Sequence, residues 1–388
     1  MLQRFWVDNY KTFFYKTDVS LKSKPYGHLP DMVMDNGLLR SCMIFGANNV
    51  GKSKLIEALK LLRAYVCSND SEEIETLLSG KIIGNWGMYA SEDFCSLKKL
   101  TELGVDILIE DNGHEYLYRY VLVLKILLKK GYRICDLYSS DPKYENIEYK
   151  VISETLKLCR DNEKKPYRVV YFNEGNEIKR LINNRGNPHV KRVYDWFKND
   201  LIIVNVGDQR PFELFNRPNH YLENLNEVIR CMDVGIDHLE WVNDAYEVVH
   251  TNGWRSDLSD ESEGTRRIVD LAPALIPGYD GKTIVIDELN RKLHPDLTRR
   301  FIELFVLEQE EKKQLIFTTH ETRLLDDWLF RRDEILFVRE KKTYPEDRAK
   351  VVCQSSECIP LSDPNGRSLW EEYIGAITDS TQDMGGIE

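Results

Sequence analysis

Hydrophobic positions along this chain follow two different periods, and their order predicts a mixed α/β protein. Short apolar runs, typical of buried strands, lie at residues 42–45, 283–286 and 314–319. Directly after the first run, Leu55, Leu59 and Leu62 share one face of a predicted helix, and residues 221–232 have the pattern of an amphipathic helix. Buried strands that alternate with helices are typical of a parallel sheet.

A second pattern, rich in aromatic and β-branched residues, predicts antiparallel strands. It begins at residues 2–21, where we expect two short strands joined by a turn near Asp8-Asn9. Further strand-like runs lie at residues 105–110, 116–120, 149–152 and 167–172. Asp111-Asn112-Gly113 has the composition of a hairpin turn between the first two of these runs. The polar, acidic residues 68–75, by contrast, are expected to open a loop.

These patterns predict a discontinuous core at residues 1–99 and 201–388, interrupted by an inserted antiparallel β-rich lobe at residues 100–200. The lobe has no heptad repeat, so we do not expect a long coiled-coil arm. Lysine and arginine residues gather at 125–133 and 179–192. A solvated face is favoured over a nucleic-acid groove as the interpretation of each group.

The strongest candidate for chemistry is a complete G-x-x-x-x-G-K-[ST] motif between the first apolar run and the first predicted helix. Its residues are Gly46, Ala47, Asn48, Asn49, Val50, Gly51, Lys52 and Ser53. Glycines let backbone N–H groups turn around an anion, and the following helix adds the positive end of its dipole. Lys52 can then reach the β- and γ-phosphates of a nucleotide, and the Ser53 hydroxyl can bind Mg²⁺. The alternative is a chance glycine-rich turn, which the complete match and the correct flanks disfavour.

Two adjacent carboxylates, Asp287 and Glu288, follow the apolar run at 283–286. At the carboxyl end of a strand in a parallel sheet, they would lie where α/β proteins bind their ligands. We expect Asp287 to hold Mg²⁺, directly or through water, and Glu288 to polarise the water that attacks the γ-phosphate. Without the phosphate loop, an exposed strand end with two acids would explain this pair equally well.

Two weaker candidates flank this pair in the sequence. Ser262, Gly264 and Thr265 open a predicted helix, where a hydroxyl and free N–H groups form a second anion-binding arrangement, although ordinary helix caps look the same. His320 follows the buried run at 314–319, where it can contact the γ-phosphate edge. Aromatic candidates for contact with an adenine ring, each better explained by core packing, are Tyr10, Phe13 and Phe14.

Composition limits the classes of protein that fit. The 388 residues carry a formal net charge of −11, which disfavours a protein that coats nucleic acid but leaves room for a local basic groove. The eight cysteines are scattered without a C-x-x-C pair, and we interpret them as reduced thiols of a cytoplasmic protein. The first residues lack the apolar core of a signal peptide, and the best apolar run, residues 121–128, is interrupted by Lys125, so no membrane partner is expected.

Taken in order, the motifs resemble those of the ATP-binding-cassette (ABC) ATPases of the RecF, SMC and OLD group. The resemblance covers residues 1–70 and 220–375, and it rests on the phosphate loop, Ser262–Thr265, Ile286-Asp287-Glu288, Leu293-His294-Pro295 and Thr318-Thr319-His320. Within the group, the chain is most similar to stand-alone bacterial AAA ATPases of abortive-infection and phage-defence systems, of the RloA-like and PARIS types. The resemblance implies a P-loop NTPase fold of ABC type.

The resemblance also implies how the site is completed. Two ATPase domains, in a homodimer or a higher homo-oligomer, would sandwich ATP and Mg²⁺ between the phosphate loop of one and the Ser262–Thr265 segment, the signature, of the other. The implied roles are phosphate binding for Lys52, Mg²⁺ binding for Ser53 and Asp287, general base for Glu288 and switch histidine for His320.

Two residues depart from the pattern of this group. Val50 replaces a small residue in the phosphate loop, and Lys292 replaces a small polar residue, which puts communication between the two sites in question. Gln209 is a candidate for the Q-loop glutamine only by its order in the chain.

Three functions remain open from the sequence. The favoured one is an ATPase that senses or regulates a separate effector, a nuclease or a toxin, in anti-phage defence, with DNA or a phage-derived molecule as the trigger. The alternatives are a RecF- or SMC-like DNA-repair ATPase and a nucleotide-binding scaffold with little turnover. We expect the segment after His320 to be too short for a nuclease domain, so the ATPase would act through another protein.

Overall fold

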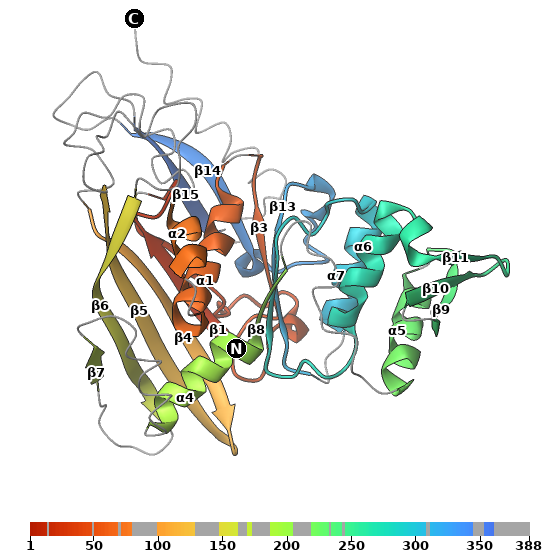
Figure 1. Cartoon of the computed structure of the whole chain (residues 1–388), viewed down its shortest axis with the longest axis horizontal. Helices are drawn as coiled ribbons and strands as arrows, with labels where there is room; N and C mark the ends of the chain where they lie inside the picture. The colour runs from red at the N-terminus through yellow and green to blue at the C-terminus, as the bar shows by residue number, and fades with distance from the viewer. Residues whose placement is uncertain are drawn as a thin grey trace, which may run out of the picture.

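Three sheets and the helices packed against them form the molecule (Figure 1). The computed structural model describes residues 1–13, 15–48, 50–68, 71–79, 99–128, 147–161, 169–172, 187–204, 219–232, 234–242, 245–307, 311–343 and 353–360. Within these residues there are two six-stranded sheets and one three-stranded sheet.

A largely parallel sheet lies at the centre and confirms the three predicted buried strands. In spatial order its strands are β15 (Cys353–Pro360), β14 (Ile335–Thr343), β3 (Ser41–Phe45), β13 (Gln314–Thr319), β12 (Thr283–Ile286) and β8 (Leu201–Val204). All neighbours pair in parallel except β14 and β15. Successive side chains of a strand point to opposite faces. Cys42 and Ile44 therefore enter one hydrophobic core, while Met43 and Phe45 enter a second core on the other face.

An antiparallel sheet packs on the first of these cores. In spatial order its strands are β2 (Thr17–Ser20), β1 (Leu2–Asp8), β4 (Thr101–Asp111), β5 (His114–Leu128), β6 (Ile147–Asp161) and β7 (Val169–Phe172). Asn112 and Gly113 form the predicted hairpin turn, with φ angles of 52° and 77°. Because β1 pairs with β4, the predicted lobe shares one sheet with the first strands of the chain. Its boundaries at residues 100–200 stay a prediction.

Helices fill the core between these two sheets (Figure 1). They are α1 (Lys52–Cys67), α2 (Ser71–Ser79), α4 (Pro188–Asp195) and a π-helical continuation, Trp196–Asp200. The loop predicted at residues 68–75 is wrong, because most of this segment belongs to α2. Ile74 and Leu78 lie one helical turn apart and are both buried, so packing of one face outweighs the polar composition of the other.

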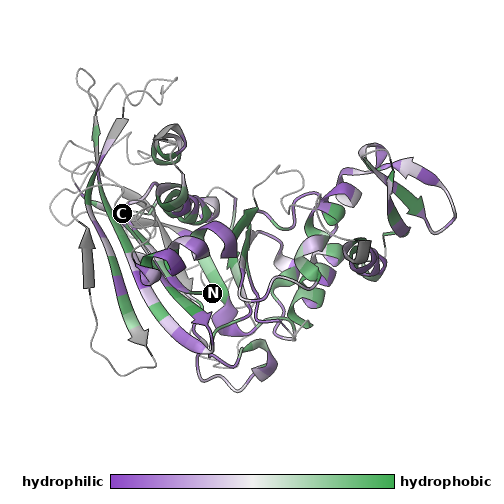
Figure 2. Ribbon diagram, turned by 60° about the horizontal axis from the view of Figure 1, so that its bottom comes forward, coloured by the Kyte–Doolittle hydropathy of each residue, from purple (hydrophilic) through white to green (hydrophobic). Residues whose placement is uncertain are grey.

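The opposite face of the parallel sheet carries a second group of helices. They are α5 (Asn219–Cys231), which confirms the predicted amphipathic helix, α6 (Glu263–Leu271) and α7 (Pro295–Leu307). A small antiparallel sheet of β9 (Ile236–Val242), β10 (Ala245–His250) and β11 (Arg255–Asp257) projects beside α5 (Figures 1 and 2). Within the described residues, no helix is both long and apolar enough to cross a membrane.

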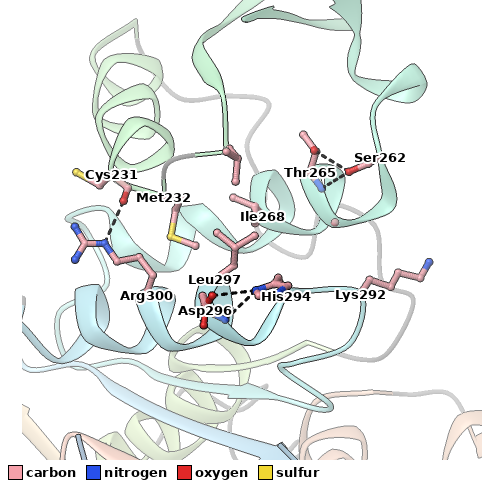
Figure 3. A pocket seen from close by; sticks show the side chains of 12 residues that line it. Cys231, Met232, Ser262, Thr265, Ile268, Lys292, His294, Asp296, Leu297 and Arg300 are labelled. Atoms are coloured by element: carbon pink, nitrogen blue, oxygen red, sulfur yellow. Dashed lines mark hydrogen bonds and ion pairs between the residues drawn. The ribbon is translucent and has the colours of Figure 1, made fainter. Parts of the chain in front are cut away.

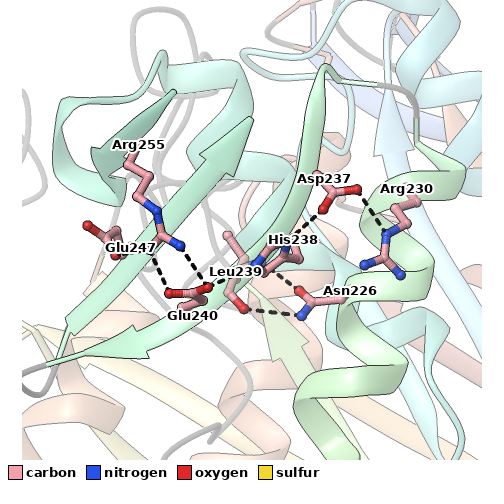
Figure 4. A network of polar contacts seen from close by, with 8 residues as sticks. All are labelled: Asn226, Arg230, Asp237, His238, Leu239, Glu240, Glu247 and Arg255. Atoms are coloured by element: carbon pink, nitrogen blue, oxygen red, sulfur yellow. Dashed lines mark hydrogen bonds and ion pairs between the residues drawn. The ribbon is translucent and has the colours of Figure 1, made fainter. Parts of the chain in front are cut away.

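A polar network joins this small sheet to α5 (Figure 4). The side-chain amide of Asn226 accepts a hydrogen bond from the N–H of Leu239 at 2.8 Å and donates one to its carbonyl oxygen at 3.1 Å. On the sheet itself, Arg255 donates to both Glu240 and Glu247. Hydrogen bonds, first of all from Arg255, lower the pKa of Glu240 to about 2.

A buried polar cluster anchors the start of β3, the strand that leads to the phosphate loop. The Glu334 carboxyl group accepts hydrogen bonds from the Ser41 hydroxyl and from the backbone N–H of Arg331, each at 2.9 Å. The guanidinium of Arg331 donates to backbone carbonyl oxygens of the loop at residues 24–29. Burial raises the pKa of Glu334 to about 8, so its carboxyl group is largely protonated at neutral pH.

Replacing Glu334 with Gln should therefore change how stability depends on pH. The carboxyl group has its ordinary pKa of 4.5 in the unfolded chain and a pKa of about 8 in the folded one. Its stabilising contribution is full below the unfolded pKa and is lost as the pH rises through the folded pKa. Between about pH 5 and about pH 8, the urea midpoint of the wild type should fall relative to that of Glu334→Gln.

Glu110→Gln, at an exposed position, is the matched control and should leave this pH dependence unchanged. Parallel curves for the wild type and Glu334→Gln would contradict the assignment of a raised pKa to Glu334.

Candidate functional site

The phosphate-loop motif lies between β3 and α1, as predicted, with Asn49 outside the described residues. Gly51 has a φ of 104°, a left-handed conformation that favours glycine. Gly46 passes so close to β14 that a Cβ atom there would lie 2.4 Å from the carbonyl oxygen of Val338. Each glycine is therefore required by the backbone path of the loop.

Lys52 begins α1 and folds over the loop. Its Nζ donates hydrogen bonds to the carbonyl oxygens of Gly46 at 2.8 Å and Ala47 at 2.6 Å. Burial lowers the pKa of Lys52, and the charges of Glu288 and Asp287 partly offset this effect. The ammonium group thus lies within electrostatic reach of both predicted carboxylates.

The carboxylate of Asp287 joins the two predicted motifs. Its Oδ1 accepts hydrogen bonds from the hydroxyl of Ser53 at 3.0 Å and from that of Thr318 at 2.6 Å. Ser53 belongs to α1, Asp287 follows β12, and Thr318 lies on β13. The sequence analysis gave Thr318 no role of its own. Its position could have been a signal, because Thr318 lies near the end of β13, the strand between β3 and β12, which carry the two motifs.

These oxygen atoms fit the ligand preferences of Mg²⁺. A hydroxyl and a carboxylate converge, and hard cations bind oxygen ligands of this kind with water and nucleotide phosphates completing the shell. Among the described residues, no group of three or more His, Cys, Asp or Glu side chains has metal-binding geometry. The assignment of Ser53 and Asp287 to Mg²⁺ stays a prediction.

Glu288 has an unusual backbone conformation. Its φ of 49° is left-handed, which costs a non-glycine residue about 1 kcal/mol or more. The N–H of Glu288 donates to the Thr318 hydroxyl at 2.7 Å, and the N–H of Leu289 donates to the Thr318 carbonyl oxygen at 3.1 Å. Its carboxylate pairs with Arg291 at 3.2 Å. The predicted base therefore stands on a fixed backbone, with an arginine as its partner.

His320 directly follows β13 and is exposed. Its Nε2 lies 3.4 Å from the amide nitrogen of Asn290. The oxygen of the same amide accepts a hydrogen bond from the Thr319 hydroxyl at 3.1 Å. Asn290, which sequence reasoning missed, thus connects the predicted switch histidine to the loop after Glu288.

The signature forms the start of α6. Ser262 is the N-cap, and its hydroxyl accepts a hydrogen bond from the N–H of Thr265 at 3.1 Å. A Cβ atom on Gly264 would lie 2.9 Å from the carbonyl oxygen of Lys292. Lys292 also donates to Glu263 at 2.8 Å. Lys292, one of the two residues that depart from the pattern of the ATPase group, therefore connects the signature to the loop after Glu288.

A cavity of about 920 Å³ opens beside the signature, between α5, α6 and α7 (Figure 3). Met232, Ile268 and Leu297 contribute apolar surface, and Lys292 and Arg300 contribute positive charge. Part of the signature lines this cavity, so its hydroxyl-bearing residues face a space large enough for another molecule or a segment of another chain.

The structure divides the predicted site residues into two groups. Lys52, Ser53, Asp287 and Glu288 come together at the ends of the central strands. The signature is carried by α6, which packs in the core on the other face of the sheet from α1. Only the loop after Glu288, through Lys292, contacts the signature in the interactions described above.

The aromatic candidates for an adenine contact have different outcomes. Tyr10 and Phe13 are both buried in the core between the two large sheets, and the Tyr10 hydroxyl donates to the carbonyl oxygen of Leu77. For Tyr10 and Phe13, the structure thus confirms core packing, which the sequence analysis favoured over contact with an adenine ring. Phe14 and the Q-loop candidate Gln209 lie outside the described residues.

Known proteins share this architecture. A family model described as “AAA domain, putative AbiEii toxin, Type IV TA system” matches residues 42–326. The solved structure “SMC head domain from Thermotoga maritima” is 16% identical, with a TM-score of 0.48, covering 93% of this chain and 99% of that one. A second, “Crystal structure of the SmcHead bound to the C-winged helix domain of ScpA”, is 14% identical, with a TM-score of 0.51, covering 94% and 99%. The fold is that of an SMC head, a P-loop fold of the ATP-binding-cassette type. No curated protein matches the sequence.

Replacing Gly46 with Ala should abolish tight nucleotide binding. The new methyl group would meet the carbonyl oxygen of Val338 on a neighbouring strand, so the phosphate loop itself must shift. We expect ATP affinity, measured by calorimetry, to fall by about 10-fold or more, because misplaced N–H groups lose charge-assisted hydrogen bonds to phosphate. Gly27→Ala is the matched control, since a Cβ atom there meets nothing within 4 Å. Equal affinities for both variants would contradict the role of Gly46.

Proposed function

The chain belongs to the AAA-domain family whose model it matches, and from this premise we propose that it binds and hydrolyses ATP between two copies of itself. One observation carries the proposal. The Asp287 carboxylate joins Ser53 of the phosphate loop to Thr318, with Lys52 and Glu288 beside it. This arrangement supplies a phosphate cradle, oxygen ligands for Mg²⁺ and a carboxylate base in one place.

Each side chain has a defined part in the proposed reaction. Lys52 binds the β- and γ-phosphates, while Ser53 and Asp287 hold Mg²⁺, which neutralises phosphate charge when bound. Glu288 accepts a proton from the attacking water as the water oxygen bonds to the γ-phosphorus. The bond from that phosphorus to the β,γ-bridging oxygen breaks, and ADP and phosphate leave. His320 contacts the γ-phosphate edge.

A second copy of the chain completes the proposed site. The signature lies on the face of the sheet opposite α1, and the exposed hydroxyl of Ser262, at the start of α6, can contact a nucleotide held by another subunit. The cavity beside Ser262 leaves room for such an approach. In this arrangement Ser262, Gly264 and Thr265 bind the γ-phosphate of the ATP seated on residues 46–53 of the partner subunit.

We further propose that this ATPase senses or regulates a separate effector, a nuclease or a toxin, in the bacterial cytoplasm. The family description, which names a toxin of a type IV toxin–antitoxin system, supports a defence setting of this kind. DNA or a phage-derived molecule would act as the trigger. The net charge of −11 disfavours a dedicated DNA clamp, which works through an extended basic surface, and leaves room for a local contact with a DNA trigger.

Glu288→Gln should keep ATP binding and lose turnover. The substitution removes the proton acceptor but keeps the size of the side chain, so we expect hydrolysis to fall by about 100-fold or more. It should also trap an ATP-bound dimer, visible by light scattering. Phosphate release measured with purified protein tests this, and turnover close to that of the wild type would exclude Glu288 as the base.

Mixing two inactive variants should restore activity if the signature acts across subunits. A Ser262→Arg chain keeps its phosphate loop, and a Lys52→Ala chain keeps its signature. Random pairing makes half of the dimers mixed, each with one complete site, so roughly one quarter of wild-type turnover should return. If the signature served its own chain, every site would keep one defect and no activity would return.

Ser259→Arg is the matched control, because Ser259 is exposed and precedes the signature; this variant alone should remain active. ATP-dependent dimerisation should be followed by light scattering in the same mixtures. Folded variants that fail in both hydrolysis and dimerisation would exclude the two-subunit site.

A further inference from the structure

Arg291 holds the carboxylate of the proposed base. Its Nη1 lies 3.2 Å from Oε2 of Glu288, and the N–H of Arg291 donates to the carbonyl oxygen of Glu288 at 2.9 Å. A backbone hydrogen bond and a side-chain ion pair therefore close the turn between Glu288 and Arg291. An arginine at this point places a permanent positive charge at the base, since a guanidinium does not lose its proton in proteins.

This ion pair is suited to exchange. The side chains of Arg291 and Glu288 are 51% and 35% exposed, and an ion pair in such a setting contributes little to stability. The contact with the Glu288 carboxylate is made through Nη1, whereas a terminal phosphate carries more negative charge and can accept two parallel N–H groups of the guanidinium. A phosphate that arrives within reach would therefore displace the carboxylate.

The Glu288 carboxylate links Arg291 electrostatically to the phosphate loop. Glu288 and Asp287 act on the ammonium of Lys52, and Glu288 is also the ion-pair partner of Arg291, so one carboxylate interacts with both cations. A terminal phosphate bound by Lys52 adds negative charge beside Glu288. The Glu288 carboxylate and this phosphate repel each other, and the guanidinium of Arg291 can reduce the repulsion by binding the phosphate.

We propose that Arg291 binds the terminal phosphate of a nucleoside triphosphate, exchanging the Glu288 carboxylate for that phosphate when ATP enters. This inference rests on the proposed ATPase function. The exchange has two effects on the reaction. It leaves the Glu288 carboxylate able to accept the proton of the attacking water, and it adds a cation to the phosphate oxygens where negative charge is redistributed during transfer. Without ATP, the Glu288 carboxylate stays paired with Arg291.

Selective binding of triphosphate is the first test. Calorimetric titrations of Arg291→Ala should show about 10-fold weaker affinity for a non-hydrolysable ATP analogue and unchanged affinity for ADP, because only the analogue carries the terminal phosphate. Arg291→Lys should recover part of the loss through its charge. Arg230→Ala is the matched control, since Arg230 is also 51% exposed and paired with a carboxylate, that of Asp237, outside the site.

The competing carboxylate provides the second test. Glu288→Gln frees the guanidinium, so this variant should bind the ATP analogue several-fold more tightly than the wild type. In an Arg291→Ala chain, Glu288→Gln should give a smaller gain, because only the repulsion between carboxylate and phosphate is then relieved. An equal gain in the two backgrounds would overturn the exchange of partners.

The outcomes separate this inference from the proposed function. A wild-type chain that binds no ATP analogue would refute both. A wild type that binds and hydrolyses ATP, with an Arg291→Ala variant equal to it for the analogue and for ADP, would overturn the role of Arg291 alone. Faster turnover of Arg291→Ala with unchanged affinities would also overturn it, because Arg291 would then only restrain Glu288.

Discussion

The carboxylate of Asp287 is the interaction on which the rest of the site depends. One of its oxygens accepts hydrogen bonds from Ser53 and Thr318, so three segments remote in sequence meet at a single atom. A buried carboxylate without hydrogen-bond partners would be strongly unfavourable. The need to satisfy Asp287 therefore fixes the positions of Ser53 and Thr318 relative to it. The hydroxyl of Thr318 also accepts a hydrogen bond from the N–H of Glu288, so the residue that holds Asp287 also positions the proposed base.

The parallel sheet makes this meeting possible. The carboxyl ends of β3, β12 and β13 lie at one edge, and their alternating side chains supply a separate core on each face. As a result, α1 is fixed on one side and α6 on the other. The same architecture occurs in SMC heads, but at 14% identity that likeness defines a fold and leaves the biological role to the site and its partners.

Sequence patterns predicted the central strands and the four charged or polar residues of the first group, because motifs tie those residues to particular strand ends. They did not predict α2, whose buried face of Ile74 and Leu78 depends on a neighbouring core. They also missed Thr318, Asn290 and Arg291. Thr318 and Asn290 make contacts between adjacent strands or loops, which spacing along one chain does not encode, and Arg291 pairs with Glu288 through a turn whose conformation the motif does not specify.

Asn226 blocks the middle of one edge of the small sheet to other chains. A strand edge offers unpaired N–H and C=O groups that another polypeptide can use to add a strand. At the outer edge of β9, the amide of Asn226 already occupies both groups of Leu239. A binding partner that reaches this projection must therefore recognise side chains rather than extend the sheet at that point. The projecting sheet can stay exposed beside α5 without offering this stretch of backbone as a template for aggregation.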